Sequence, residues 1–321
     1  MTTRKTPAQP SPFRYTVSMR ETGALADEDR LHATLNVLQS MELRLNAARP
    51  IGGARPMLAL TGATAIGIAT RTLQLALRPA ELLVAHNTRE DLRRFLSHNP
   101  STTLERFANV RDDLLARAQF LTIPISEYGR PAMAQPSRGD GPGHAIERGT
   151  RILLHAAMRT AAVSSVCIQR AGSKYPVRVP MLSPNGVFLV AIARIGRFSA
   201  YEREIQSLVW SLPRSPKFDD QRTLAERRLR ETGDAATHAR MAWMSIAAAT
   251  LRARNELSAA GYPEVTDRIL DDPDVFTVVN AALDTLSNQV RQHSHDALAD
   301  INRGAIVAEA RRGADRPTAQ R

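Results

Sequence analysis

Helical periodicity extends over most of the chain and constrains its fold more than any other sequence feature. Apolar residues recur near the 3.6-residue spacing of an α-helix, as in Leu31, Leu35, Leu38 and Leu45. Ser199, with Glu202 three residues later, is typical of a capping box at a helix start. These patterns predict helices over residues 27–48, 61–77, 80–97, 101–120, 150–171, 199–210, 219–260 and 264–300.

The segment Phe13–Arg20 follows a different period. Four apolar residues alternate with four polar ones, which is typical of a strand with one face on a core and the other in solvent. A second strand signal lies at 175–195. There Ser183-Pro-Asn-Gly186 separates the runs 175–182 and 187–195 and predicts a β-hairpin turn. Pro180 favours an edge position for the first of these strands.

The predicted fold class is therefore α+β and predominantly α-helical, with helices around a small antiparallel sheet. That sheet would contain 13–20, 175–182 and 187–195. Residues 129–149 are rich in Gly and Pro and are predicted to form a flexible loop. The chain then divides into a disordered tail (1–12), a strand plus helices (13–128), the loop (129–149), the hairpin with long helices (150–300) and a basic tail (301–321).

Composition restricts the class of protein. At 43% hydrophobic residues the chain can build a core, and no apolar run approaches the roughly 18 to 20 residues of a membrane helix. The first residues lack the apolar stretch of a secretory signal. The single cysteine, Cys167, cannot form an internal disulfide. We therefore expect a cytoplasmic protein without a membrane partner.

Specific signals for catalysis or cofactor binding are lacking. Thr61-Gly-Ala-Thr-Ala-Ile-Gly67 resembles a dinucleotide phosphate loop, but its second glycine is displaced by one position, and close helix packing explains the small residues. His293 and His295 would point about 200° apart on a helix and could not share a metal ion. We expect a non-enzymatic protein with no cofactor, no metal and no small-molecule substrate.

Charge points instead to an anionic partner. The chain carries 43 Lys+Arg against 32 Asp+Glu, a net charge of +11, and only three of the basic residues are lysines. A GC-rich genome explains the preference for Arg over Lys but not the excess over acids. Many arginines of the segment 219–260 alternate with acids, which is typical of an ion-paired surface. The excess on the body of the chain would attract phosphate at long range.

The strand at 13–20 offers the most specific candidate for DNA contact. Its outward face would present Arg14, Thr16, Ser18 and Arg20. A strand pair fits the major groove of DNA, and alternate side chains then reach the bases. We expect Arg178, Arg194 and Arg197, on or beside the same sheet, to hold phosphates. The order strand, helix, helix is that of ribbon-helix-helix proteins, which bind double-stranded DNA as homodimers with strands paired between subunits. Equally, 13–20 could be a structural edge strand with a soluble outer face.

The succession of segments resembles the AcaB-like proteins of conjugative plasmids and integrating conjugative elements. The resemblance is carried by the alternating strand 13–20, by Arg55-Pro-Met-Leu-Ala-Leu-Thr-Gly62, by Pro176-Val-Arg-Val-Pro-Met181 and by Phe198-Ser-Ala-Tyr-Glu-Arg203. It covers about two thirds of the chain at the level of pattern. The sequence departs from the family in its greater length and in having Leu77-Arg-Pro-Ala80 where an acidic Asp-Asp-Pro-Tyr-type segment is expected.

This resemblance implies a DNA-binding transcriptional regulator of conjugative transfer genes, encoded on a mobile element and with ribbon-helix-helix character. Two other functions remain open. One is a structural or accessory protein of the conjugation apparatus. The other is a single-stranded nucleic-acid packaging protein, which the low aromatic content of 5% disfavours.

Overall fold

The computed structural model describes residues 13–19, 35, 36, 38, 39, 42, 56, 58–70, 80–84, 120–124, 142–161, 164–170, 177–257 and 268–314. Its helices are α2 (Gly62–Ala69), α7 (Pro142–Thr160), α8 (Pro184–Ser211), α9 (Asp219–Leu257), α10 (Pro273–Leu283) and α11 (Asn288–Ala314). Its strands are β1 (Phe13–Met19), β2 (Leu58–Thr61), β3 (Ala80–Val84), β4 (Phe120–Pro124), β5 (Ser164–Arg170) and β6 (Val177–Pro180). Short 3-10 turns, η2 (Pro216–Phe218) and η4 (Ile269–Asp271), precede α9 and α10. The prediction of a predominantly helical α+β fold is confirmed.

The strands form two three-stranded sheets that meet at one point. Sheet A has the order β1-β5-β6, with β1 parallel to β5 and β6 antiparallel to it. Sheet B has the order β2-β3-β4. A bridge between Leu60 and Met181 joins β2 to the chain just after β6, and the Leu182 amide donates to the Leu60 carbonyl at 2.9 Å. The strand predicted at 13–20 is confirmed over Phe13–Met19, whereas Arg20 lies outside the described residues.

Helix α8 forms the centre of the core, and it corrects the predicted β-hairpin. Residues 187–195, expected as a strand, belong to this 28-residue helix, in which 187–193 are fully buried. The Ser183 hydroxyl accepts from the Gly186 amide, and Pro184 occupies the first helical turn, so the expected turn is a helix start. A short run of consecutive apolar residues shows neither the helical nor the strand period, because all of its side chains are buried. The hydrophobic pattern of this segment therefore could not distinguish a helix from a strand. Ser199 is consequently inside α8 and begins no helix.

The boundaries of five further predicted helices also differ from the predictions. The predicted helix 150–171 is α7 followed by β5, and α7 begins at Pro142, inside the predicted loop. The predicted helix 61–77 begins at Thr61, which is the last residue of β2. The first residues of the predicted helix 80–97 form β3 instead. The predicted helix 101–120 ends at Phe120, which is the first residue of β4. The predicted helix 264–300 is divided into α10 and α11 by a turn after Leu283, and α11 extends into the predicted basic tail. By contrast, the long helix at 219–260 is confirmed as α9.

Ribbon-helix-helix character is not confirmed. Strand β1 pairs in parallel with β5 of its own chain, and β2 intervenes between the helical residues near 35–42 and α2. An antiparallel ribbon between two subunits would need a free strand edge, and β5 occupies one edge of β1. A dimer contact through β1 would therefore have to use its other edge.

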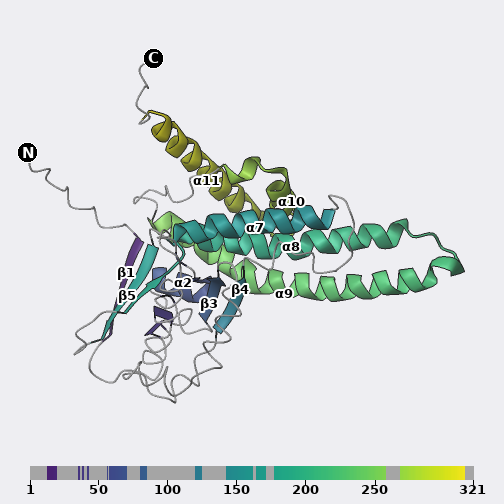
Figure 1. Ribbon diagram of the computed structural model, residues 1–321, viewed down its shortest axis with the longest axis horizontal. Coiled ribbons are helices and arrows are strands. Elements are labelled where there is room, and N and C mark those ends of the chain that lie inside the picture. The colour runs from purple at the N-terminus through teal and green to yellow at the C-terminus, as the bar shows by residue number, and fades with distance from the viewer. Residues whose placement is uncertain are drawn as a thin grey trace, which may run out of the picture.

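The long helices α8 and α9 run antiparallel and project from the body as a helical arm (Figure 1). Sheet A lies at the opposite end of the long axis from the tip of this arm. Arg240 of α9 pairs with Glu202 of α8 at 3.2 Å along the arm. Among the described residues, no helix combines the length and apolar character needed to cross a membrane.

Helix α10 packs closely on both α7 and α8 because two glycines face it. A Cβ atom added to Gly149 of α7 would lie 2.1 Å from the Asp274 carbonyl oxygen. One added to Gly196 of α8 would lie 2.0 Å from the Val278 carbonyl oxygen. Any side chain at either position would force the backbones apart. The three helices therefore form a tight unit that fixes the orientation of α7.

Candidate nucleic-acid interface

Helix α7 presents a row of basic residues along its solvent face. Between residues 143 and 160, whose side chains are all described, every exposed residue is His or Arg. His144, Arg148, His155 and Arg159 are exposed, and Arg151 is half-exposed. Their spacings of four, three, four and four residues place all five on one helix face. We refer to these five residues as the basic row; it is about 22 Å long at a rise of 1.5 Å per residue.

The opposite face of α7 explains why the row faces outward. Ile146, Leu153, Leu154 and Ala157 are all buried in the core. Burial of this apolar face fixes the rotation of the helix about its axis, since turning it would expose these side chains to water. The single acidic residue of α7, Glu147, lies on the buried side. The row therefore holds no carboxylate from its own helix.

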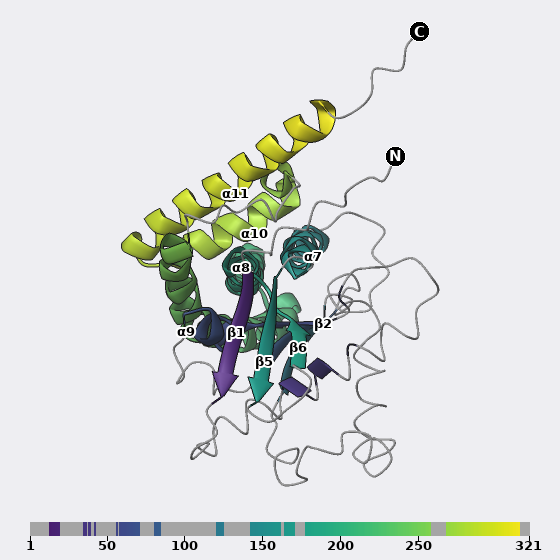
Figure 2. The ribbon, with the colours of Figure 1, turned by 90° about the vertical axis from the view of Figure 1, so that its left-hand side faces the viewer.

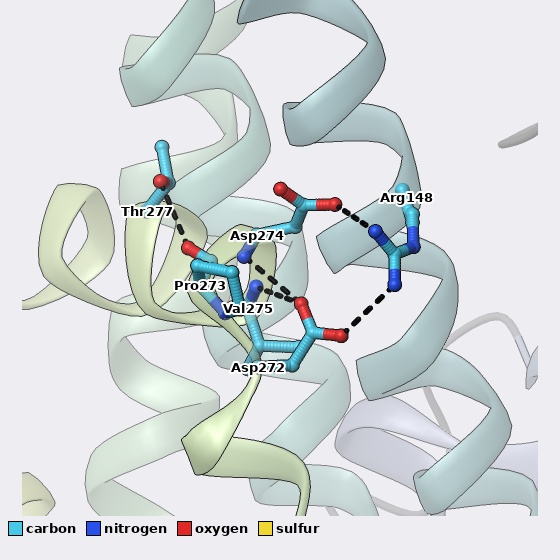
Figure 3. Close-up of polar contacts among 6 residues, drawn as sticks. All are labelled: Arg148, Asp272, Pro273, Asp274, Val275 and Thr277. Atoms are coloured by element: carbon cyan, nitrogen blue, oxygen red, sulfur yellow. Dashed lines mark hydrogen bonds and ion pairs between the residues drawn. The ribbon is translucent and has the colours of Figure 1, made fainter. Parts of the chain in front are cut away.

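Arg148 is already engaged by the start of α10 (Figure 3). Its two terminal nitrogens lie 3.0 Å from the Asp274 carboxylate and 3.3 Å from the Asp272 carboxylate. Asp272 also caps α10, because its Oδ1 accepts from the amides of Asp274 and Val275 at 2.9 and 3.4 Å. Thr277 donates to the Pro273 carbonyl in the same helical turn. Arg148 therefore ties α7 to α10.

A buried polar cluster attaches α7 to α8. Arg197 donates to Glu147 Oε1 from Nε at 3.0 Å and from Nη2 at 2.8 Å, and the Tyr201 hydroxyl donates to the same oxygen at 2.8 Å. Burial, with the nearby Glu147 charge, raises the pKa of Tyr201 above its ordinary value. Burial also raises the pKa of Glu204, one turn further along α8. The Arg197 guanidinium lies 5.1 Å from the Phe198 ring centre and is held between helices.

Sheet A brings several of the predicted DNA-contacting residues together. In its register, Arg14 is opposite Ser165, Thr16 is opposite Cys167, and Ser18 is opposite Gln169. On the other side of β5, Cys167 is opposite Arg178 of β6, which is exposed. The alternate register positions contain Val166 and Val179, both buried.

Because residues directly opposite each other share a face of the sheet, these positions belong to its outer face. We call this surface, with positions 14, 16, 18, 165, 167, 169 and 178, the outer face of sheet A.

The other predicted phosphate-contacting residues lie elsewhere. Arg194 and Arg197 belong to α8 and not to a strand of the sheet. Arg197 is held by Glu147, and the Arg194 guanidinium lies 5.6 Å from the Phe198 ring centre. Both side chains are only partly exposed. Arg194, which the predicted hairpin placed in a strand, lies instead in a helix because residues 187–195 belong to α8, and Arg197, expected on or beside the sheet, lies in the same helix.

The basic row leads toward sheet A. Helix α7 ends at Thr160, β5 begins at Ser164, and Ser164 pairs with Phe13 at the start of β1. Figure 2 shows α7 almost end-on beside the beginning of β5, with β1 on the other side of β5. Arg159, one residue before the end of α7, is thus the member of the row nearest in sequence to the sheet. The C-terminal end of the basic row therefore lies at the same end of the molecule as sheet A, and the rest of the row extends away from the sheet (Figure 1).

Sequence reasoning missed the basic row because residues 142–149 were assigned to a loop. Two of the five residues of the row, His144 and Arg148, fall in that segment. The spacing of basic residues from 144 to 159 could have revealed the row, since it follows helical periodicity as regularly as the buried apolar face does. Pro142 and Gly143 obscured it, although Pro is common in the first turn of a helix.

The phosphate-loop resemblance at Thr61–Gly67 leads to no anion site. Gly62 has a φ of +67° and follows β2, as a strand-to-helix turn requires. However, a Cβ added there would lie 2.1 Å from Glu81 Oε2, so a carboxylate already lies against the start of α2. Its negative charge would repel a phosphate. Among the described residues, no group of three or more His, Cys, Asp or Glu side chains could hold a metal ion.

Comparison of the chain with protein-family models, with curated proteins and with solved structures found no match.

Proposed function

We propose that this protein binds double-stranded DNA through the basic row of α7 and the outer face of sheet A. The basic row carries the proposal, since every residue of α7 classed as exposed between 143 and 160 is His or Arg, along about four turns of helix. Lysine and arginine contacts to phosphate supply most of the affinity of DNA-binding proteins and determine their position on the duplex. Arg151 and Arg159 would contact phosphates from the row.

The outer face of sheet A would supply sequence recognition. Arg14, Thr16, Ser18 and Arg178 are residue types that hydrogen-bond to base edges or phosphates. The register of sheet A places these four positions on the same face, which supports a role of that face in sequence recognition. We propose further that the protein acts as a homodimeric regulator of transfer genes on a mobile element, which is what the resemblance to AcaB-like proteins implies.

Two alternative functions predict different behaviour in binding experiments. A single-stranded nucleic-acid packaging protein would bind single strands at least as tightly as duplex. An accessory protein of the conjugation apparatus would bind neither, and its cationic surfaces would contact a protein. The aromatic content of 5% is low for a stacking surface and favours duplex over single strands.

The test is fluorescence anisotropy with the full chain and a labelled promoter-length duplex at low salt, repeated with one of its single strands. We expect sub-micromolar binding to the duplex and weaker binding to the single strand. Replacing Arg14 and Arg178 by Ala should remove the preference for the promoter-length duplex over a random duplex of the same length, with the thermal midpoint nearly unchanged. Failure of the wild-type chain to bind duplex below micromolar concentrations would rule the proposal out.

A further inference from the structure

The tip of the helical arm exposes large apolar side chains. Leu208 is 50% exposed, Trp210 78% and Leu224 39%, and all three lie in the last turns of α8 or the first turns of α9. The connection between the helices is itself well defined. Arg222 donates to the carbonyls of Leu212 and Pro213, which closes the tip. These apolar groups therefore belong to a folded surface. We call residues 207–231 the distal arm.

Charged residues of both signs surround these apolar side chains. Among the described residues, no oppositely charged side chain lies within 4.0 Å of any of the nine charged residues that follow. The basic ones are Arg214, Lys217, Arg227, Arg228 and Arg230, and the acidic ones are Asp219, Asp220, Glu226 and Glu231. Elsewhere many arginines are paired, as in Arg240 with Glu202 and Arg148 with Asp272. The distal arm thus combines exposed apolar groups with unpaired charges of both signs.

We propose that the distal arm is a self-association surface whose occupant is the distal arm of a second copy of this chain. In a two-fold symmetric contact, both subunits use the same patch. The patch must therefore be complementary to a second copy of itself. A surface carrying both Arg227 and Arg230 and both Glu226 and Glu231 supplies that complement. Trp210 is the anchor type that is enriched at the centre of protein interfaces.

The charge pattern disfavours other occupants. A nucleic acid or an anionic membrane would attract the five unpaired basic residues, but four exposed carboxylates on the same tip would be repelled. The basic row of α7 contrasts with this pattern, since it has no acidic residue on its exposed face. Contact through the arm tip leaves sheet A uncovered, because the two lie at opposite ends of the long axis (Figure 1). The inference is thus independent of DNA binding.

The oligomeric state of the full chain tests the proposal. We expect sedimentation velocity at micromolar concentrations to show a dimer, and Leu208→Ala with Trp210→Ala to shift it to monomer. Met241→Ala is the matched control, since Met241 is 76% exposed on α9 but lies about 25 Å along the helix from Leu224. The control should remain dimeric. A monomeric wild-type chain at about 100 μM, or a dimer that survives the double substitution, would overturn the proposal.

Charge exchange tests the symmetry of the contact without altering any buried group. Arg227→Glu with Arg230→Glu and, separately, Glu226→Arg with Glu231→Arg should each give a monomer whose circular dichroism matches the wild type. Mixing the two variants should restore a heterodimer, because each now presents the complement of the other. If the mixture stays monomeric, the distal arm does not bind its own copy. DNA affinity per chain, measured with a half-site duplex, should be unchanged in both variants.

Discussion

Replacing Arg151 and Arg159 with glutamine removes two positive charges from the basic row and leaves the buried face of α7 intact. The proposed interface contributes four arginines whose charge would neutralise DNA phosphates, whether they contact phosphates or base edges: Arg14, Arg151, Arg159 and Arg178. Each phosphate contact contributes about −0.9 to the slope of log affinity against log salt, so the wild-type slope should be about −3.6. Affinity should then fall about 150-fold between roughly 50 and 200 mM salt.

The double variant retains two of these contacts. Its slope should be about −1.8, and the same change in salt should weaken binding only about 12-fold. The measurement is anisotropy of a labelled half-site duplex over this salt range, so that the contacts of one chain are measured whatever its oligomeric state. The control is Arg227→Gln with Arg230→Gln, which removes the same charge from the distal arm. The control should keep the wild-type slope, because these residues lie at the other end of the molecule.

Comparison of the α7 variant with the distal-arm variant shows whether DNA is attracted by the net charge of the chain or by the basic row. If both reduce the slope by the same amount, DNA binding reflects the net charge of +11 and has no defined surface. If neither reduces it, the basic row does not contact phosphate. Either result would refute the reasoning that identifies α7 as the DNA-binding helix.

Three further substitutions test the packing that positions α7. Gly196→Ala should lower the free energy of unfolding by about 1–3 kcal/mol in denaturant titrations, because the new Cβ would displace the backbone of α10; an unchanged midpoint would contradict the packing. Arg197→Ala should cost about 3–5 kcal/mol, since Glu147 is 4% exposed and would lose its charge partner, and should cost less in a Glu147→Gln background. Burial raises the pKa of Glu204 in the folded state, so the contribution of this residue to stability should fall as the pH rises above about 4.5. Thermal melts between pH 4 and 8 should show this fall for the wild type, and Glu204→Gln should remove it.

Local patterns predicted part of this fold correctly. The alternation at 13–20 predicted β1, and helical periodicity predicted α9, because the period is visible in both sequences. Where burial is complete the period disappears. Residues 187–193 are fully buried in α8, and their β-branched composition resembled that of a strand. The cap at Ser183 was present in the sequence but was interpreted as a turn.

Long-range pairing explains the rest of the difference. The parallel partner of β1 is β5, about 150 residues later, and no local pattern specifies such a contact. For the candidate interface, the polar alternation of residues 14, 16 and 18 was visible in the sequence, but its alignment with Arg178 depends on the register of β5 between them. The basic row required the correct start of α7, which lies inside a segment rich in Gly and Pro.

The chain's single cysteine gives the most direct test of the DNA interface. Cys167 is half-exposed and lies between Thr16 and Arg178 in the register of sheet A. A thiol-linked photocrosslinker on Cys167 should crosslink efficiently to bound duplex. The same reagent on a Cys167→Ser chain with Met241→Cys, on the arm, should not. Efficient crosslinking from position 241, with none from Cys167, would contradict the proposal that the outer face of sheet A binds DNA.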